Sequence, residues 1–173
     1  MNGSDNLERE LIKHTLAPVY NEISEILILG TMPSPKSREN GFYYGHPQNR
    51  FWRVLSEVLS EPLPKSNEEK KTMLLKHHIA LWDVLKSCTI EGADDSSIKD
   101  PKPNDIASLI NKTHIKYIFT TGTKAYSLYN RYIKSKVGIE AVPLPSTSPA
   151  NRRYYTDEKI LKEYSILFDY TKP

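Results

Sequence analysis

Residues 26–34 decide the fold of this chain, and they read Ile26-Leu27-Ile28-Leu29-Gly30-Thr31-Met32-Pro33-Ser34. The continuous apolar run at the start is typical of a strand that is buried on both faces. The glycine and proline end this strand, and a polar and aromatic loop follows, through residues 42–52 (FYYGHPQNRFW). A loop of this length is usually functional or disordered, and the aromatic content of this one argues against disorder. We therefore expect a binding site at the carboxyl end of a central strand, where open α/β sheets bind their ligands.

Strand-like and helix-like segments alternate outward from this run. Apolar segments predict strands at residues 26–30, 79–82, 115–120 and 139–144. Amphipathic or charged segments predict helices at residues 6–17, 50–60, 67–77, 105–111, 124–134 and 156–170. The polar residues 91–103 are expected to form a loop, with Asn104 as the N-cap of the helix that follows. Strands separated by helices predict an α/β fold: a three-layer α/β/α sandwich around a central four-stranded, mainly parallel sheet, in one domain spanning residues 1–173.

The composition is that of a globular protein, with 38% hydrophobic and 26% charged residues in a chain of 173. No segment approaches the roughly 20 apolar residues of a membrane span, and residues 1–10 lack the features of a signal peptide. We therefore expect a cytoplasmic protein, associated with the nucleoid if it is prokaryotic, and a monomer. The single Cys88 excludes an internal disulfide and a cysteine-rich zinc or iron–sulfur site. The five histidines show no ligand spacing, so neither a metal nor a cofactor is expected.

Charge is distributed unevenly along the chain. Residues 1–111 carry 13 Lys and Arg against 16 Asp and Glu, whereas residues 112–173 carry 11 against 5. The first part thus has a net charge of −3 and the second a net charge of +6. A basic half beside an acidic half indicates a polyanionic partner on one face, although a solvated lysine-rich surface accounts for the charge equally well.

Residues 144–153 (LPSTSPANRR) form a third distinctive segment, directly after the last predicted strand. Its small hydroxyl side chains and prolines make a stiff, narrow loop that can approach a phosphate backbone closely. Taken alone, such a string is more often an ordinary turn. The ends of three predicted strands would bring this loop, the long loop after residue 30 and residues 120–123 to one edge of the sheet.

Together these motifs resemble the uracil-DNA glycosylase superfamily, and in particular its hypoxanthine-DNA glycosylase branch. The first motif of that branch resembles residues 30–34, and its Tyr-Tyr-x-His-Pro-x-Asn-x-Phe-Trp block is matched within residues 43–52. Residues 80–85, Cys88, Asp95-Ser96, residues 103–105 and residues 144–150 also match, in the same order. Two positions depart from the family. Ser34 stands where the family usually has glycine, and Thr121 stands near the position of a common asparagine, which would shift the base preference if that asparagine contacts the base.

The resemblance implies a DNA repair enzyme for base excision, which flips a deaminated base, hypoxanthine or uracil, out of double-stranded DNA and hydrolyses its N-glycosidic bond. It places the main catalytic role on Asn49, whose amide can orient water or donate to the base but is no strong general base. Asn49 also suits the N-cap of the helix that begins near residue 50. His46 is a second catalytic candidate, as a donor to the leaving base or to a phosphate. Lys36 and Lys124 stay open as candidates for a lyase step, but we expect a monofunctional enzyme.

Other residues receive binding roles from the same resemblance. The expected base-binding residues are Gly30, Thr31, Met32, Pro33, Tyr43, Tyr44 and Thr121. The expected DNA-binding residues are Ser146, Thr147, Ser148, Pro149, Ala150, Asn151, Arg152 and Arg153, with the wedge among positions 149–152. Phe51, Trp52 and Trp82 are expected in the core, and Asp83 at a strand end is a candidate for the pocket lining.

Two alternative functions stay open at this level. A catalytically impaired, lesion-binding domain of the same fold is consistent with the departures at Ser34 and Thr121. A hydrolase of small nucleosides is disfavoured by the basic second half and the Ser-Pro loop, because a nucleoside needs no phosphate grip. The preferred base also stays open among hypoxanthine, uracil, xanthine and alkylated purines.

Overall fold

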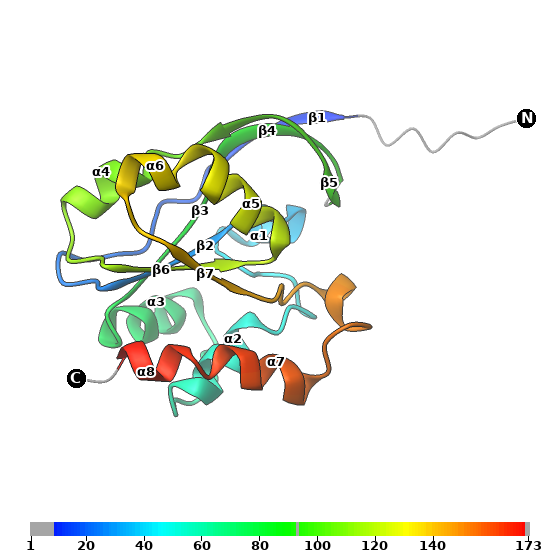
Figure 1. Cartoon of the computed structure of the whole chain (residues 1–173). Coiled ribbons are helices and arrows are strands. Elements are labelled where there is room, and N and C mark those ends of the chain that lie inside the picture. The colour runs from blue at the N-terminus through cyan, green and yellow to red at the C-terminus, as the bar shows by residue number, and fades with distance from the viewer. Residues whose placement is uncertain (1–8, 93, 172–173) are drawn as a thin grey trace, which may run out of the picture.

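A parallel four-stranded sheet forms the centre of the molecule in the computed structural model, which describes residues 9–92 and 94–171 (Figure 1). Its strand order is β3-β2-β6-β7. The strands are β2 (Ile26–Gly30), β3 (Ile79–Asp83), β6 (Tyr117–Thr121) and β7 (Ala141–Leu144). Ile26 of β2 pairs with Ile79 of β3 on one side and with Tyr117 of β6 on the other. All four predicted strands are therefore present, and β2 is central.

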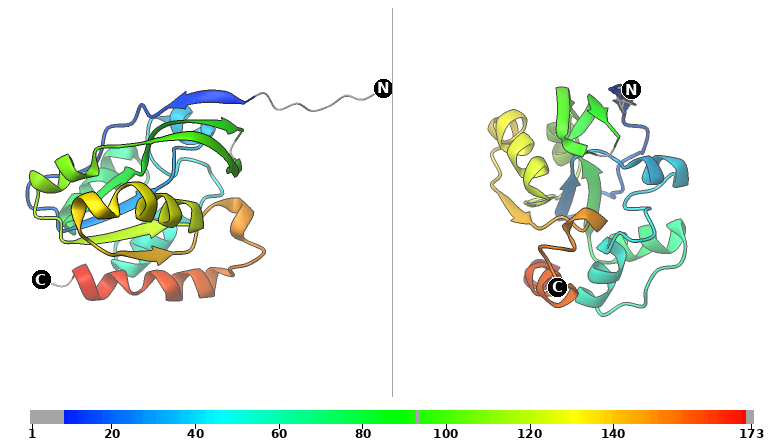
Figure 2. Two further views of the ribbon diagram at one scale, coloured as in Figure 1. Left: turned by 45° about the horizontal axis from the view of Figure 1, so that its top comes forward. Right: turned by 90° about the vertical axis from the view of Figure 1, so that its right-hand side faces the viewer.

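Helices lie against both faces of this sheet. One face is covered by α2 (Phe51–Val58), α3 (Asn67–Lys76), α7 (Asp157–Tyr164) and α8 (Leu167–Thr171). The other face carries α4 (Ile106–Asn111), α5 (Thr123–Tyr132) and α6 (Lys134–Val137). The short α1 (Pro35–Asn40) lies in the loop after β2. Two further views show the sheet between its two layers of helices (Figure 2). The predicted three-layer α/β/α fold is confirmed.

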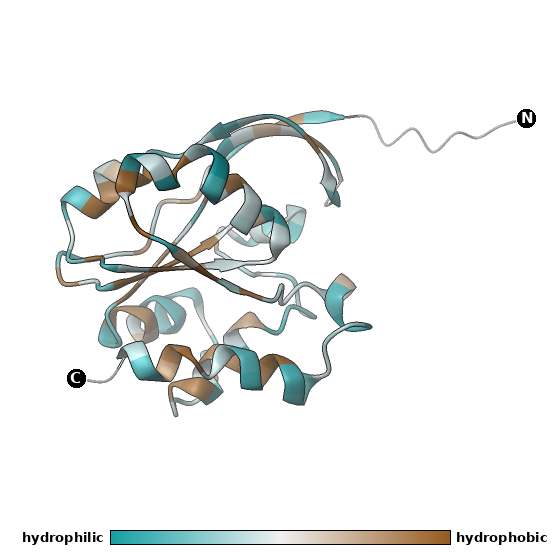
Figure 3. Ribbon diagram, viewed as in Figure 1, coloured by the Kyte–Doolittle hydropathy of each residue, from teal (hydrophilic) through white to brown (hydrophobic). Residues whose placement is uncertain are grey.

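The apolar run of β2 serves both faces of the sheet. Ile26 and Ile28 belong to the core beneath α2, α3 and α7, whereas Leu27 and Leu29 belong to the core beneath α4 and α5. All four side chains are fully buried, as expected for alternating residues of a strand covered on both sides. Figure 3 shows hydrophobic residues along the central strands and in alternation with hydrophilic ones along the helices.

A second sheet was not predicted. It is antiparallel, with the order β1-β4-β5, and consists of β1 (Glu10–Lys13), β4 (Leu85–Glu91) and β5 (Asp94–Pro103). The helix predicted at residues 6–17 is wrong over its described part, because residues 10–13 pair with β4 and bury only Ile12; residues 6–8 lie outside the described residues. The loop predicted at residues 91–103 is also wrong, because most of it is β5. That strand buries only Ile98, so its sequence shows no apolar alternation.

Two smaller predictions also need correction. The N-cap of α4 is Asp105, whose carboxylate accepts a hydrogen bond from Ser108 N at 3.0 Å. Asn104 is instead a buried residue that connects two strands, since its amide nitrogen donates to the carbonyls of Asp83 in β3 and Leu85 in β4. The single helix predicted at residues 156–170 is divided into α7 and α8 by a break after Tyr164. Within the described residues, no helix is long and apolar enough to cross a bilayer.

Candidate active site

A cavity of about 370 Å³ opens where β2, β3 and β6 end. Gly30, Asp83 and Thr121 are the last residues of these three strands, and all three line it. The predicted site residues that join them are Thr31, Met32, Pro33, Tyr43, Tyr44, His46, Asn49, Ser146, Thr147, Ser148, Pro149 and Ala150. The loops that the sequence singles out therefore do converge on one cavity. Asn151, Arg152 and Arg153 are not among its lining residues.

The loop after β2 is ordered by its own hydrogen bonds. Ser34 caps α1, its hydroxyl accepting from Ser37 N at 3.1 Å, and Gly41 ends this helix with a φ of 75°. The Ser37 hydroxyl then accepts from Gly45 N at 2.9 Å, which fixes the chain just before His46. Ser34 thus has a local structural role as a helix cap.

Aromatic residues of this loop pack into the core beneath the cavity. Tyr43 is 2% exposed and its hydroxyl donates to the carbonyl of Ala17 at 2.8 Å, so it is mainly a core residue. Trp52 donates its indole N–H to the Tyr43 carbonyl, and both Phe51 and Trp52 are buried, as predicted. Tyr44 stacks on Phe51 with ring centroids 3.9 Å apart. Tyr44 has a φ of 53°, which is uncommon for a bulky residue and typical of functional loops.

The hydroxyls of Tyr44 and Thr121 are hydrogen-bonded at 2.9 Å. Burial, with the nearby charge of Asp83, raises the pKa of Tyr44 well above its ordinary value. The phenol is therefore neutral near pH 7. Thr121 is buried as well, so this pair forms one wall of the cavity where the sequence led us to expect a base-reading side chain.

Asp83 forms the next part of the cavity wall, as its strand-end position suggested. Its Oδ2 lies 2.8 Å from Nε2 of His14, and both side chains are about 5% exposed or less. The other oxygen lies close to Gly30, because a Cβ added to Gly30 would stand 2.6 Å from Asp83 Oδ1. No sequence pattern selects His14, which lies within a segment predicted as helix. Its position depends on the second sheet.

Asn49 and His46 both line the cavity and both have one polar atom engaged within the loop. The amide oxygen of Asn49 accepts from Phe51 N at 2.9 Å, at the start of α2. Its amide N–H₂ is therefore the group that Asn49 offers to a ligand. Nδ1 of His46 accepts from Gln48 N at 3.0 Å, so the neutral imidazole carries its proton on Nε2 and can donate there.

The loop after β7 is shaped by its own hydroxyl groups. The Ser146 hydroxyl accepts from Ser148 N at 3.1 Å, and that of Ser148 accepts from Ala150 N at the start of the 3₁₀ helix η1 (Pro149–Asn151). The Asn151 amide donates to the Ser146 carbonyl at 2.9 Å. Thr147 is buried, and its hydroxyl has no hydrogen-bond partner within the described part of the chain.

Arg50 lies behind this loop and is 2% exposed. Its Nη1 donates to the Tyr155 carbonyl at 2.7 Å and to Asp157 at 3.2 Å, while its backbone N–H donates to the Thr147 carbonyl. Arg50 thereby joins the Asn49 segment to the loop after β7. The Arg50 guanidinium lowers the pKa of the Asp157 carboxyl, mainly through its hydrogen bond to that group.

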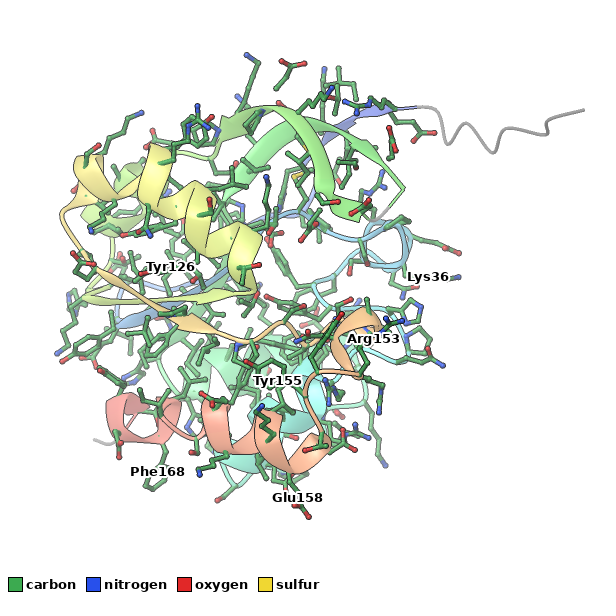
Figure 4. All side chains as sticks on the ribbon, turned by 45° about the vertical axis from the view of Figure 1, so that its right-hand side comes forward. Lys36, Tyr126, Arg153, Tyr155, Glu158 and Phe168 are labelled. Carbon is green, nitrogen blue, oxygen red and sulfur yellow. The ribbon has the colours of Figure 1, made fainter. Side chains whose placement is uncertain are left out.

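Basic side chains extend outside the cavity. Arg152 lies 3.8 Å from Asp157, and the guanidinium of Arg153 stands over the Tyr154 ring at 5.9 Å. Lys36 lies on exposed α1, paired with Glu39 at 3.4 Å. Figure 4 places Lys36 and Arg153 on the same side of the molecule. Neither Lys36 nor Lys124 is among the residues that line the cavity.

The second sheet and α1 complete the cavity with residues that the sequence did not assign to it. These residues are Ile12, Pro35, Ser37, Arg38, Ile90, Gly92 and Asp95. Asp95 as a whole is exposed, but partial desolvation of its carboxyl group and the charge of Asp83 raise its pKa to about 6, against the lowering effects of Lys124 and the Thr31 hydroxyl. Asp95-Ser96 is part of the family resemblance. Because residues 91–103 are predicted as a loop, the sequence offers no reason to expect Asp95 at the site.

Metal ligands do not cluster here. Across residues 9–92 and 94–171, no group of three or more His, Cys, Asp or Glu side chains has an arrangement suited to a metal ion. Amide, imidazole, hydroxyl and carboxyl groups line the cavity.

Comparison with known proteins identifies relatives of the chain. Two proteins named hypoxanthine DNA glycosylase are similar in sequence. The one from Methanosarcina acetivorans is 40% identical over 146 residues, which cover 83% of this chain and 91% of that protein. The one from Methanosarcina barkeri is 37% identical over 149 residues, which cover 85% of this chain and 93% of that protein.

A solved structure is also similar throughout. It is the solution NMR structure of a Methanosarcina acetivorans protein assigned as a candidate uracil DNA glycosylase, with a TM-score of 0.80 and 34% identity. The alignment covers 94% of this chain and 99% of that one. The family model described as the uracil DNA glycosylase superfamily matches residues 17–166, a span that includes the three loops of the cavity. The chain belongs to the uracil DNA glycosylase superfamily.

Proposed function

We propose that this protein is a monofunctional DNA glycosylase that removes hypoxanthine from double-stranded DNA by hydrolysing the N-glycosidic bond. The observation that carries this proposal is the meeting of Asn49, His46 and the residue 146–150 loop around one cavity at the end of β2. The relatives named hypoxanthine DNA glycosylase support the choice of base. The cavity volume of about 370 Å³ suits a single base, being within the range of small-molecule sites.

The reaction requires the base to leave the helix, because a stacked base does not expose its glycosidic bond. In the transition state, the sugar gains oxocarbenium character and negative charge grows on the departing base. Donors aimed at that base lower the barrier. The Nε2–H of His46 and the N–H₂ of Asn49 are two donors that would serve this purpose.

Backbone contacts would hold the duplex at the cavity mouth. The loop of Ser146 to Ala150 carries small side chains, and Arg152 and Arg153 follow it directly. Such residues contact phosphates without reading sequence. Arg152 or the residues of η1 would fill the space that the flipped base leaves.

Uracil is the second base that we propose as a substrate, at a lower rate. Its smaller ring would fill less of the cavity. The hydroxyls of Tyr44 and Thr121, which are bonded to each other, would reach a ring of this size less well. The same pair would favour the larger hypoxanthine ring, which reaches further toward it.

The test is a cleavage assay on labelled duplexes, each with one hypoxanthine, uracil or xanthine. Wild-type protein is compared with Asn49→Ala, and the far Asn111→Ala is a control for amide removal at the surface. Alkali-labile sites at hypoxanthine that fade in Asn49→Ala alone would support the proposal. If no duplex is cleaved while salt-sensitive DNA binding persists, the lesion-binding alternative replaces it.

A further inference from the structure

We propose that Asp95 is the general base of this site: it accepts the proton of the water that attacks the sugar. The inference rests on the proposed function and adds a residue to it. Hydrolysis of a glycosidic bond needs a proton acceptor, and the amide of Asn49 is too weak a base for that task. An acceptor must therefore come from another group of the cavity.

Two carboxyl side chains line the cavity among the described residues, Asp83 and Asp95. Asp83 is 4% exposed and has Oδ2 bound to His14 at 2.8 Å, so it is held as part of the wall. Asp95 keeps solvent-exposed surface while lining the same cavity, so water can reach it. Asp95 is thus the carboxyl that is both accessible and placed at the site.

The hairpin of β4 and β5 delivers Asp95 to this position. Glu91 of β4 pairs with Asp94 of β5, and Ile90 and Gly92 line the cavity beside Asp95. The Thr31 hydroxyl, directly after β2, is close enough to the Asp95 carboxyl to lower its pKa. The second sheet thus places a carboxyl group at the cavity formed where the parallel strands end.

The groups around Asp95 set its protonation. Partial desolvation of the carboxyl group, in a residue that is exposed as a whole, has the largest effect on its pKa and raises it. Asp83 on β3 and Asp94 on β5 raise it as well, while Lys124 on α5 and the Thr31 hydroxyl lower it. Arg38 of α1, together with Tyr43, Tyr44 and His46 of the loop after β2, lines the same cavity. The result is a pKa of about 6, well suited to a base that works near neutral pH, where the carboxylate is ionised.

Atoms and electrons balance in this step. The water oxygen forms a bond to C1′ of the sugar while the bond from C1′ to the base nitrogen breaks. One water proton passes to the Asp95 carboxylate. The base leaves with the electron pair of the broken bond and is neutralised by a proton from a donor of the cavity or from solvent. No oxidant, reductant or further reactant is needed.

The experiment measures single-turnover excision of hypoxanthine by wild-type protein, Asp95→Asn and Asp94→Asn across pH 4.5–8.5. Asp94 is the matched control, because it is the adjacent carboxylate of β5, binds Ser96 and does not line the cavity. Asp95→Asn is expected to lower the rate by about 10²- to 10⁴-fold, as for loss of a general base, with Asp94→Asn near the wild-type rate. The wild-type rate should fall below pH 6, and this decline should be absent in Asp95→Asn.

Two further measurements separate a chemical role of Asp95 from a role in DNA binding or in packing. Affinity for the hypoxanthine duplex should be unchanged in Asp95→Asn, and formate added to Asp95→Ala should restore part of the rate by replacing the carboxylate. A near-normal rate in Asp95→Asn, an unchanged acid decline, or a defect in binding alone would overturn the role of Asp95. A wild-type protein that excises no base would instead refute the proposed function itself.

Discussion

The Tyr44 hydroxyl lies 2.9 Å from the Thr121 hydroxyl, joining two residues that are 77 positions apart in the sequence. The contact connects the aromatic loop after β2 to the carboxyl end of β6 and forms a wall of the cavity. In this structure the Thr121 hydroxyl is therefore engaged with Tyr44.

Tyr44→Phe tests this relationship. The variant keeps the ring that stacks on Phe51 but loses the hydrogen bond, so unfolding free energy should fall by about 0.5–1.5 kcal/mol. The freed Thr121 hydroxyl should change the ratio of hypoxanthine to uracil excision. Tyr129→Phe is the control, since it also loses a hydrogen bond, to the Ile139 carbonyl, on the opposite core. A change of selectivity in both variants, or in neither, would contradict the assignment.

Gly30→Ala should damage the cavity with little effect on the rest of the fold. The added Cβ would stand 2.6 Å from Asp83 Oδ1 and 3.1 Å from the Tyr44 hydroxyl oxygen. The Asp83 carboxyl must then shift, which would disturb its contact with His14. We expect excision to fall by at least about tenfold, the effect of about 1.4 kcal/mol on the barrier. Gly41→Ala gives the contrast. Its φ of 75° costs stability, but beyond its chain neighbours and its own helix no described part of the chain lies within 4 Å of the added Cβ, so activity per folded molecule should persist.

Arg50→Met tests the connection between the two loops. The variant preserves bulk but loses the charged hydrogen bond to the Tyr155 carbonyl, so we expect a loss of about 1.5–3 kcal/mol in urea unfolding. Arg53→Met is the matched control, because it removes another arginine that pairs with Asp157. Arg53 is half exposed and 3.5 Å from the same Asp157, and its loss should cost at most about 1 kcal/mol. Equal costs for the two variants would show that burial of Arg50 is not what matters.

Asp95 should also leave a signature in the pH dependence of stability. Its pKa is about 6 in the folded protein, above the ordinary 3.8, so the folded state binds the proton more tightly. The stability contributed by Asp95 is therefore complete below the ordinary pKa and is lost as pH rises through 6. Asp95→Asn should raise the melting temperature at pH 7.5 and raise it less at pH 5. A lower melting temperature of Asp95→Asn at pH 7.5 would contradict a raised pKa of Asp95.

The central sheet was predictable because its signals are local. The apolar run of β2 and the amphipathic pattern of α2, with Phe51, Val54, Leu55 and Val58 on one face, reflect burial directly. The convergence of three loops followed from parallel topology alone. Asn49, His46 and the residue 146–150 loop were found from motifs, and the structure places all of them on the cavity.

The second sheet was hidden for a physical reason. β5 buries one residue in ten, so it has no apolar alternation, and β1 is only four residues long. Pairing with β4, which no local pattern reports, makes both of them strands. Through this sheet Asp95 reaches the cavity and His14 reaches Asp83, which is why their positions did not follow from the sequence.

The most direct measurement is product analysis after a single turnover on a duplex that holds one hypoxanthine, run in ¹⁸O-labelled water. A hydrolytic, monofunctional glycosylase should release free hypoxanthine and an intact abasic strand in equal amounts, with the label at C1′ of the sugar. Absence of free base, or a strand cut before alkali is added, would contradict the account.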